Sequence, residues 1–152
     1  MLNAKISEIV KVVDVIGPID PTNAADEYNG QWLDLSLYDD IMFVISVGDV
    51  AATLTAAVYE TTNVNTADSP DGDGAAVTGK SVEFSGSDDN EQKIINISAR
   101  DFDGDDGLRQ VRLQVTNVDS PPGVLGFHAI ALATRRHTEQ AGHVSSVTEV
   151  KI

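Results

Sequence analysis

The residues best suited to chemistry form an acidic, glycine-containing stretch over residues 101–107, Asp-Phe-Asp-Gly-Asp-Asp-Gly. Carboxylates at alternate positions can converge on one hard cation, so the stretch predicts a candidate Ca²⁺ site built from Asp101, Asp103 and Asp105. An EF-hand loop also needs Gly at its sixth position and Glu at its twelfth, where this chain has Asp106 and Arg112. The mismatch favours the alternative, a plain acidic turn between two strands.

Other catalytic and cofactor-binding patterns are missing from the sequence. There is no cysteine, no Gly-x-Ser-x-Gly or His-Glu-x-x-His pattern, and no glycine-rich phosphate loop. His128, His137 and His143 do not have the spacing of metal ligands. A second acidic stretch, at residues 68–74, spaces its aspartates less regularly and is interpreted as a turn. We therefore expect a protein that is not an enzyme and holds no cofactor, with Ca²⁺ as the one exception to test.

Two sets of residues are candidates for contact with a partner. The cationic set lies near the chain ends and comprises Lys5, Lys11, Arg135 and Arg136. These residues can pair with carboxylates on another protein or neutralise the chain's own acidic loops. The aromatic set comprises Tyr28, Trp32, Tyr38 and Tyr59. Aromatic rings can stack on sugars, but the scatter of this set along the chain favours ordinary core and rim packing.

Apolar patterns predict the strands that position these residues. Residues 5–16 fit both a helical stripe and a strand, and their β-branched content favours a strand that Gly17-Pro18 ends. Residues 32–37 alternate between apolar and polar side chains and predict a half-buried strand, followed by an acidic turn over 38–40. Residues 41–47 form a continuous apolar run. Such a run predicts a central strand covered on both faces, within the domain or by a partner chain.

The rest of the chain repeats this pattern. Leu54, Ala56 and Val58 predict a further strand, antiparallel to the preceding one if the connection at 48–52 is a hairpin. More strands are predicted at residues 82–84, 93–99, 108–116 and 124–133. Polar, acidic loops at 62–75, 86–91 and 101–107 are expected to face solvent. Short strands at this spacing predict an all-β fold, a single antiparallel β-sandwich or β-barrel of jelly-roll-like form.

The length of 152 residues suits one domain with one core. We expect an N-terminal arm or strand over residues 1–16, a β-sandwich domain over 17–136, and an extended C-terminal tail over 137–152. No apolar stretch is long enough for a membrane span or an export signal. The lack of cysteine fits synthesis in a reducing bacterial cytoplasm.

Charge is concentrated in the middle of the chain. The formal net charge is −14, and residues 17–134 hold five Lys and Arg against twenty Asp and Glu. The two ends together hold five against four. This balance argues against binding to nucleic acid, which needs clustered cations to displace counterions. The near-neutral ends are electrostatically the easiest part of the chain to place against another protein.

The segments at residues 11–20, 32–38, 41–48, 53–60 and 108–115 resemble small structural proteins encoded near the major capsid gene of tailed bacteriophages and prophages. The resemblance spans roughly residues 8–134 and rests on strand patterns rather than catalytic signatures. It implies a virion component, since decoration or cement proteins of this size are typically β-sandwiches or β-barrels that trimerise over capsomer junctions. The acidic middle and the tail after Arg136 depart from that group.

We therefore expect a virion protein, made in the host cytoplasm, that decorates and stabilises the outer capsid surface as a homotrimer. Its expected partners are the major capsid protein and itself, with no nucleic acid and no membrane. Two alternatives remain open. One is a tail- or fibre-associated module whose loops bind a host-surface glycan, and the other is a tail-tube or head–tail connector subunit.

Overall fold

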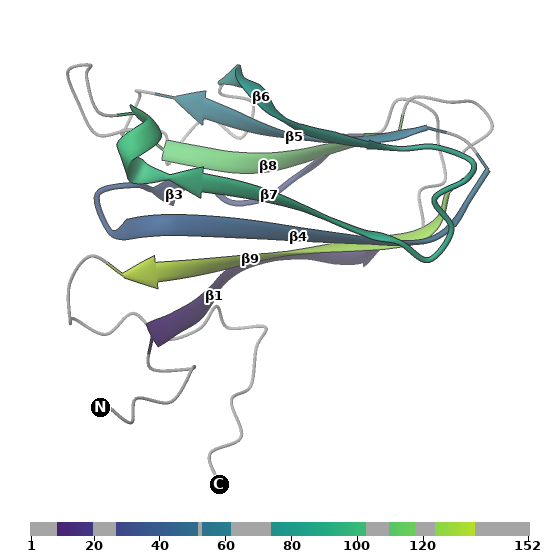
Figure 1. Cartoon of the computed structure of the whole chain (residues 1–152), viewed down its shortest axis with the longest axis horizontal. Helices are drawn as coiled ribbons and strands as arrows, with labels where there is room; N and C mark the ends of the chain where they lie inside the picture. The colour runs from purple at the N-terminus through teal and green to yellow at the C-terminus, as the bar shows by residue number, and fades with distance from the viewer. Residues whose placement is uncertain are drawn as a thin grey trace, which may run out of the picture.

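The computed structural model describes residues 9–19, 27–51, 53–61, 74–102, 110–117 and 124–135, which form two antiparallel sheets packed as a sandwich (Figure 1). Sheet A has four strands, in the order β1 (Val10–Ile19), β9 (Val124–Arg135), β4 (Tyr38–Val50) and β7 (Gln92–Ser98). Sheet B has five, in which β2 (Glu27–Asn29) and β3 (Leu33–Asp34) both pair with β8 (Gln110–Asn117), followed by β5 (Leu54–Thr61) and β6 (Ala75–Phe84). A 3-10 helix, η2 (Ala99–Phe102), follows β7. The predicted all-β sandwich is confirmed, and the described strands do not close into a barrel.

The strand pairs are nested like one long hairpin. β1 pairs with β9, β2 and β3 with β8, β4 with β7, and β5 with β6. Successive pairs alternate between sheet A and sheet B, so the long hairpin is rolled up into two layers. This connectivity is that of a jelly roll. It brings the first and last described strands side by side at one edge of sheet A.

The core lies between the two sheets and is built from alternate residues of each strand. β4 contributes Ile41, Phe43 and Ile45, and β5 contributes Leu54, Ala56 and Val58, as the alternation in the sequence predicts. Phe84 and Phe127 fill the space between the sheets and are buried. Each large apolar side chain buried in this way contributes roughly 1.5–3 kcal/mol relative to exposure. This core fixes which residues of every strand face outward.

β1 does not end at Gly17-Pro18, as the sequence predicts, but continues to Ile19. The register with β9 shifts between Ile16 and Ile19, so Gly17 and Pro18 form an irregularity within the strand. Gly17 has a φ of 86°, and a Cβ atom there would lie 2.8 Å from the backbone oxygen of Phe127. Glycine fits this position because it has no Cβ. The Gly-Pro signal therefore marks a bulge on an edge strand rather than a strand end.

The predicted strand over residues 32–37 is wrong in extent, because β3 covers Leu33–Asp34 alone. The Asp34 carboxylate accepts a hydrogen bond from the backbone N–H of Ser36 at 2.8 Å, and the Asp34 carbonyl accepts one from Leu37 at 3.1 Å. Because the turn begins after two strand residues, Leu37 no longer continues the alternation that buries Leu33, and it is 53% exposed. The acidic residues at 38–40, expected to turn, instead begin β4.

The strands at 41–47 and 54–58 do not form a hairpin, so the condition for pairing them antiparallel is not met, because β4 and β5 belong to different sheets. β4 is paired on both sides, by β9 and β7, and β5 is paired by β6 and β8. Neither strand has an edge left for the other, so the connection crosses between the layers. The loops at 62–73 and 103–109, and the segments 1–8 and 136–152, lie outside the described residues.

Candidate interaction surfaces

The outward side of sheet A carries apolar residues from all four strands in its middle and polar residues towards both strand ends. The register places on this side the residues that pair with Met42 and Val44 of β4, namely Leu132 and Ile130 of β9 and Asn96 and Ile94 of β7. Through β9 the same side includes Val12 and Val15 of β1. We define the apolar face as Val12, Val15, Met42, Val44, Ile94, Ile130 and Leu132. It consists of aliphatic side chains and one thioether, and on β7 it is bordered by Asn96.

The apolar face is partly exposed in the described part of the chain. Ile94 is 52% exposed, and Met42 and Val44 are half-buried. The run at 41–47 lies in a central strand of sheet A, as predicted, but its apolar side chains are buried on the inward side and only half-buried on the outward side. The core covers Ile41, Phe43 and Ile45, whereas no described element lies over Met42 and Val44. The sequence carries a signal for this face in two places. Residues 41–47, apart from Ser46, and residues 129–133 are apolar without interruption, so these strands have apolar side chains on both faces.

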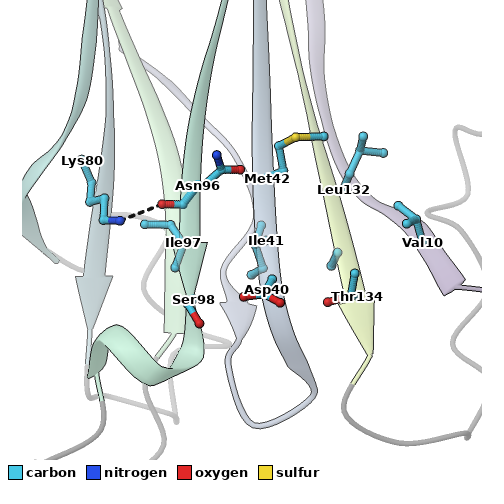
Figure 2. A pocket seen from close by; sticks show the side chains of 11 residues that line it. Val10, Asp40, Ile41, Met42, Lys80, Asn96, Ile97, Ser98, Leu132 and Thr134 are labelled. Carbon is cyan, nitrogen blue, oxygen red and sulfur yellow. Dashed lines mark hydrogen bonds between the residues drawn. The ribbon is translucent and has the colours of Figure 1, made fainter.

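A shallow hollow of about 460 Å³ lies at one end of the apolar face. Figure 2 shows Met42, Leu132 and Val10 projecting from three neighbouring strands along the hollow, with Asp40 and Thr134 at its end. At the other side, Lys80 of β6 donates a hydrogen bond from Nζ to the backbone oxygen of Asn96 at 2.8 Å. The hollow therefore combines an apolar wall with one carboxylate at its end.

The outward side of sheet B has a different chemistry. Gln114 of β8 donates hydrogen bonds from Nε2 to Glu27 at 3.2 Å and to Asn29 at 3.0 Å, and it is only 7% exposed. Arg112 is also 7% exposed, and its guanidinium lies 4.6 Å from the centre of the Trp32 ring. Its Nε atom is buried without a hydrogen-bond partner. The outward side of sheet B is therefore covered by polar side chains that contact each other and by the indole ring of Trp32.

The four aromatic residues of the sequence analysis do not share one surface. Tyr28 packs edge-on against Phe127 in the core, with ring centres 5.2 Å apart, and Tyr38 is buried. Tyr59 pairs with Arg112 in the sheet, on the outward side where Trp32 also lies. A Cβ atom on Gly74 would lie 2.6 Å from the Trp32 ring, so the backbone at Gly74 covers part of that ring. The expected core and rim packing is confirmed for Tyr28 and Tyr38.

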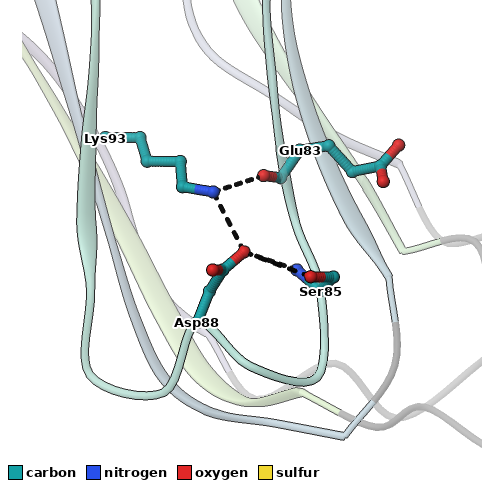
Figure 3. Close-up of polar contacts among 4 residues, drawn as sticks. All are labelled: Glu83, Ser85, Asp88 and Lys93. Carbon is teal, nitrogen blue, oxygen red and sulfur yellow. Dashed lines mark hydrogen bonds and ion pairs between the residues drawn. The ribbon is translucent and has the colours of Figure 1, made fainter.

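The edge of sheet A at β7 is tied to sheet B by lysine side chains. Lys93 of β7 donates from Nζ to the backbone oxygen of Glu83 in β6 at 2.7 Å and forms an ion pair with Asp88 at 2.9 Å (Figure 3). Lys80 makes the reverse contact, from β6 to β7. The backbone N–H of Ser85 also binds Asp88, and this bond, followed by the contact with Lys93, lowers the pKa of the Asp88 carboxyl. The turn at 86–91 is largely exposed, as predicted, and it also fastens the two layers together.

The other edge of sheet A holds a buried carboxylate that sequence reasoning did not find. Asp14 of β1 is 5% exposed and accepts a hydrogen bond from the backbone N–H of Gln31 at 2.9 Å. Gln31 lies between β2 and β3, so this bond joins sheet A to sheet B. Burial raises the pKa of Asp14, and the hydrogen bonds from Gln31 and Val15 oppose that shift. The sequence offers no signal for this role, because Asp14 is one of twenty-four acidic residues.

The predicted site residues are only partly within the described chain. Of the candidate Ca²⁺ ligands, Asp101 lies in η2, whereas Asp103 and Asp105 fall outside the described residues. The described residues contain no group of three or more His, Asp or Glu side chains that could hold a metal ion. Whether the three aspartates bind Ca²⁺ stays a prediction.

Two of the four cationic residues are brought to one corner of the sandwich. Lys11 pairs with Ala133, two residues before Arg135 at the end of β9, so both lie where β1 begins and β9 ends. Lys11 shares the inward side of the sheet with Ala133 and is half-buried at the rim. Lys5 and Arg136 lie outside the described residues. We call the site of Lys11 and Arg135 the basic corner.

A scan against protein-family models and a search of curated proteins found no match to this chain. In the part of the chain that the structure describes, no helix is both long and apolar enough to span a membrane.

Proposed function

We propose that this chain is a structural protein of a tailed-phage virion, which binds the outer surface of the capsid and stabilises the shell as a homotrimer. The observation that supports this best is the uneven surface of the sandwich. A chain of net charge −14 presents an apolar face on sheet A and, beside it, a corner that carries Lys11 and Arg135. Such a division suits a protein that touches other proteins on one side and water on the other.

The basic corner is where both chain ends leave the sandwich, and the ends are near neutral. Asp39 and Asp40 of β4 lie beside this corner, because Tyr38 pairs with Arg135 and Asp40 with Thr134, so the two cations would meet the shell together with these carboxylates. Lys5 and Arg136, the neighbours of this corner in sequence, add to the same cationic set. Many copies that each bridge neighbouring capsid subunits oppose the pressure of packaged DNA, because weak contacts add up when they are multivalent.

The jelly-roll topology is compatible with this function but does not select it. Double-sheet jelly rolls occur in viral capsid domains and also in lectins, so the fold fits both the proposal and the glycan-binding alternative. The resemblance of the strand segments to small virion proteins favours the first. Acidic side chains on the remaining surface keep decorated particles apart from one another and from other polyanions.

The test is co-sedimentation of the purified protein with matching capsids that lack it. We expect saturable binding that weakens with salt, and we expect the pair Lys11→Glu and Arg135→Glu to reduce it at least about tenfold, since like charges would then face the shell. Arg100→Glu, which changes the charge by as much as either single substitution alone, is the control for those single variants, because Arg100 is an exposed cation beyond β7, at the opposite edge of sheet A. No binding of the unaltered protein to intact heads would overturn the proposal and favour a tail or glycan-binding role.

A further inference from the structure

We infer that the apolar face of sheet A is the surface through which copies of this chain associate with one another. This inference deepens the proposed function and rests on it in one respect, that the protein acts as an oligomer. The proposed function does not say which surface joins the copies. The geometry of the two sheets provides that answer.

The edges of sheet A are poorly suited to association by strand pairing. At the β7 edge, Lys93 reaches from β7 to Glu83 in sheet B, and Lys80 reaches from β6 in sheet B to the backbone oxygen of Asn96 in β7. At the β1 edge, the register shifts twice, between Val12 and Asp14 and between Ile16 and Ile19, and Pro18 lacks a backbone donor. Bulges and prolines of this kind protect edge strands from pairing with another chain. The remaining mode of contact is packing against the flat side of the sheet.

The charge distribution selects a second copy as the occupant of the apolar face. Two chains of net charge −14 repel each other over most of their surfaces. Asp40 is the one formally charged residue on the outward side of sheet A within the described stretch from Asp40 to Ser46 of β4 and the residues paired with it. A basic partner would be drawn to the acidic surfaces and would leave this face uncovered. A second copy can approach closely only where no like charges oppose each other.

The size of the face indicates how strong the association is. Four strands about 4.8 Å apart and seven residues rising about 3.3 Å each give an area of roughly 440 Å². This area includes the outward polar residues from Asp40 to Ser46 and their partners, so the apolar face is about half of it, roughly a quarter of the area of about 800 Å² that each partner buries in a stable two-protein interface. The polar rim around the face must supply the rest. We therefore expect an oligomer that assembles and dissociates with concentration rather than a permanent one.

The decisive experiment is sedimentation equilibrium of the full chain over a wide range of concentrations. Ile94→Glu places a charge on the apolar face at a residue that is already 52% exposed, so it spares the core. We expect it to raise the dissociation constant about 10- to 100-fold, by removing a buried aliphatic side chain and opposing like charges. Ser81→Glu is the matched control, because Ser81 is exposed on β6 in sheet B and receives the same charge. It should leave the constant unchanged.

Three outcomes would overturn the inference. The unaltered chain could remain monomeric at every concentration, or Ser81→Glu could disrupt the oligomer as strongly as Ile94→Glu. Alternatively, Ile94→Glu could destabilise the dilute, monomeric chain while Ser81→Glu does not, which would mean that the chain's own residues cover the face. Capsid binding separates this inference from the proposed function. A monomer that binds shells contradicts the inference alone, and an oligomer that binds no shells contradicts the proposed function alone.

Discussion

The two outward faces of the sandwich are both formed by antiparallel strands, but polar side chains cover one and apolar side chains are partly exposed on the other. On sheet B, Gln114 and Arg112 fold over the strands, bind or stack on neighbouring side chains, and become almost fully buried. On sheet A, Val44 lies on the central strand β4 and is half-buried, and Ile94 lies beside it on the edge strand β7 and is 52% exposed. Apart from the Arg112 Nε atom, the sheet B face is covered by contacts within a single chain, whereas on our inference the sheet A face is completed by a second copy.

This difference separates folding from association. A side chain on the sheet B face contributes to the stability of one chain, because its contacts lie within that chain. A side chain on the apolar face contributes mainly when a second surface covers it, because water otherwise contacts it. Substitutions on the two faces should thus be distinguishable by measuring unfolding and association separately.

The largest expected effect comes from Arg112→Ala. It removes a buried side chain that supports the Trp32 ring, and should lower the free energy of unfolding by roughly 2–3 kcal/mol. Met42→Ala on the apolar face should cost less than about 1 kcal/mol in the same dilute solution, because Met42 is half-buried. Urea denaturation measures both. Equal costs would mean that the apolar face is already covered within one chain.

Asp14 offers a sharper test at the edge where the two sheets meet. Asp14→Ala leaves the Gln31 backbone N–H without its acceptor and should cost about 1–2 kcal/mol. Asp14→Asn keeps an acceptor and removes a charge that burial disfavours, so at neutral pH it should be at least as stable as the unaltered protein.

The pH dependence of Asp14 follows from the direction of its shift. The folded pKa of Asp14 lies above its ordinary value of 3.8, so the stabilisation is present below the unfolded pKa and is lost as pH rises through the folded pKa. The difference in unfolding free energy between the unaltered protein and Asp14→Asn should therefore shift towards Asp14→Asn as pH rises through that value. A difference independent of pH would contradict burial as the cause.

A smaller effect is expected at Gln114. Its replacement by Ala removes two side-chain hydrogen bonds on sheet B and should cost about 1 kcal/mol. Gln92→Ala is the matched control, since Gln92 is exposed at the end of β7 on the outward side of sheet A and should change stability little. Thermal or urea unfolding of the two variants compares the faces with the same substitution. A larger loss for Gln92 would reverse the comparison.

The smallest effect is expected at Asp88, whose carboxyl is exposed. Hydrogen bonds from Ser85 and Lys93 lower its folded pKa, so its contribution is present above the unfolded value of 3.8 and is lost as pH falls through the folded pKa. Asp88→Asn should therefore reduce stability slightly at neutral pH and flatten the acid limb of the profile. An unchanged acid limb would show that the β6–β7 connection does not depend on this ion pair.

Sequence patterns predicted the fold class because the core depends on alternation, which is local. Leu54, Ala56 and Val58 are buried as their spacing requires. The same patterns failed at residues 32–40, because the carboxylate of Asp34 forms a turn that interrupts an otherwise regular alternation. The same patterns left open whether β4 and β5 form a hairpin, because sheet membership depends on long-range pairing, which neighbouring residues do not encode.

The candidate surface was only half visible in the sequence. The unbroken apolar run at 41–47 indicated a strand that needs cover on both sides, and the structure shows cover on one. The apolar face itself also needs Ile94, Ile130 and Leu132, which come from distant parts of the chain and meet only through register. Asp14 and Arg112 gave no signal, because burial of a charged residue depends on tertiary contacts.

The most direct test of this account is a cryo-EM map of capsids decorated with the full-length protein. The account predicts density on the outer shell in which copies cluster around a symmetry axis with the β1-β9-β4-β7 sheets against one another and the basic corner towards the shell. Isolated copies that present that sheet to solvent, or decorated shells without density outside them, would contradict it.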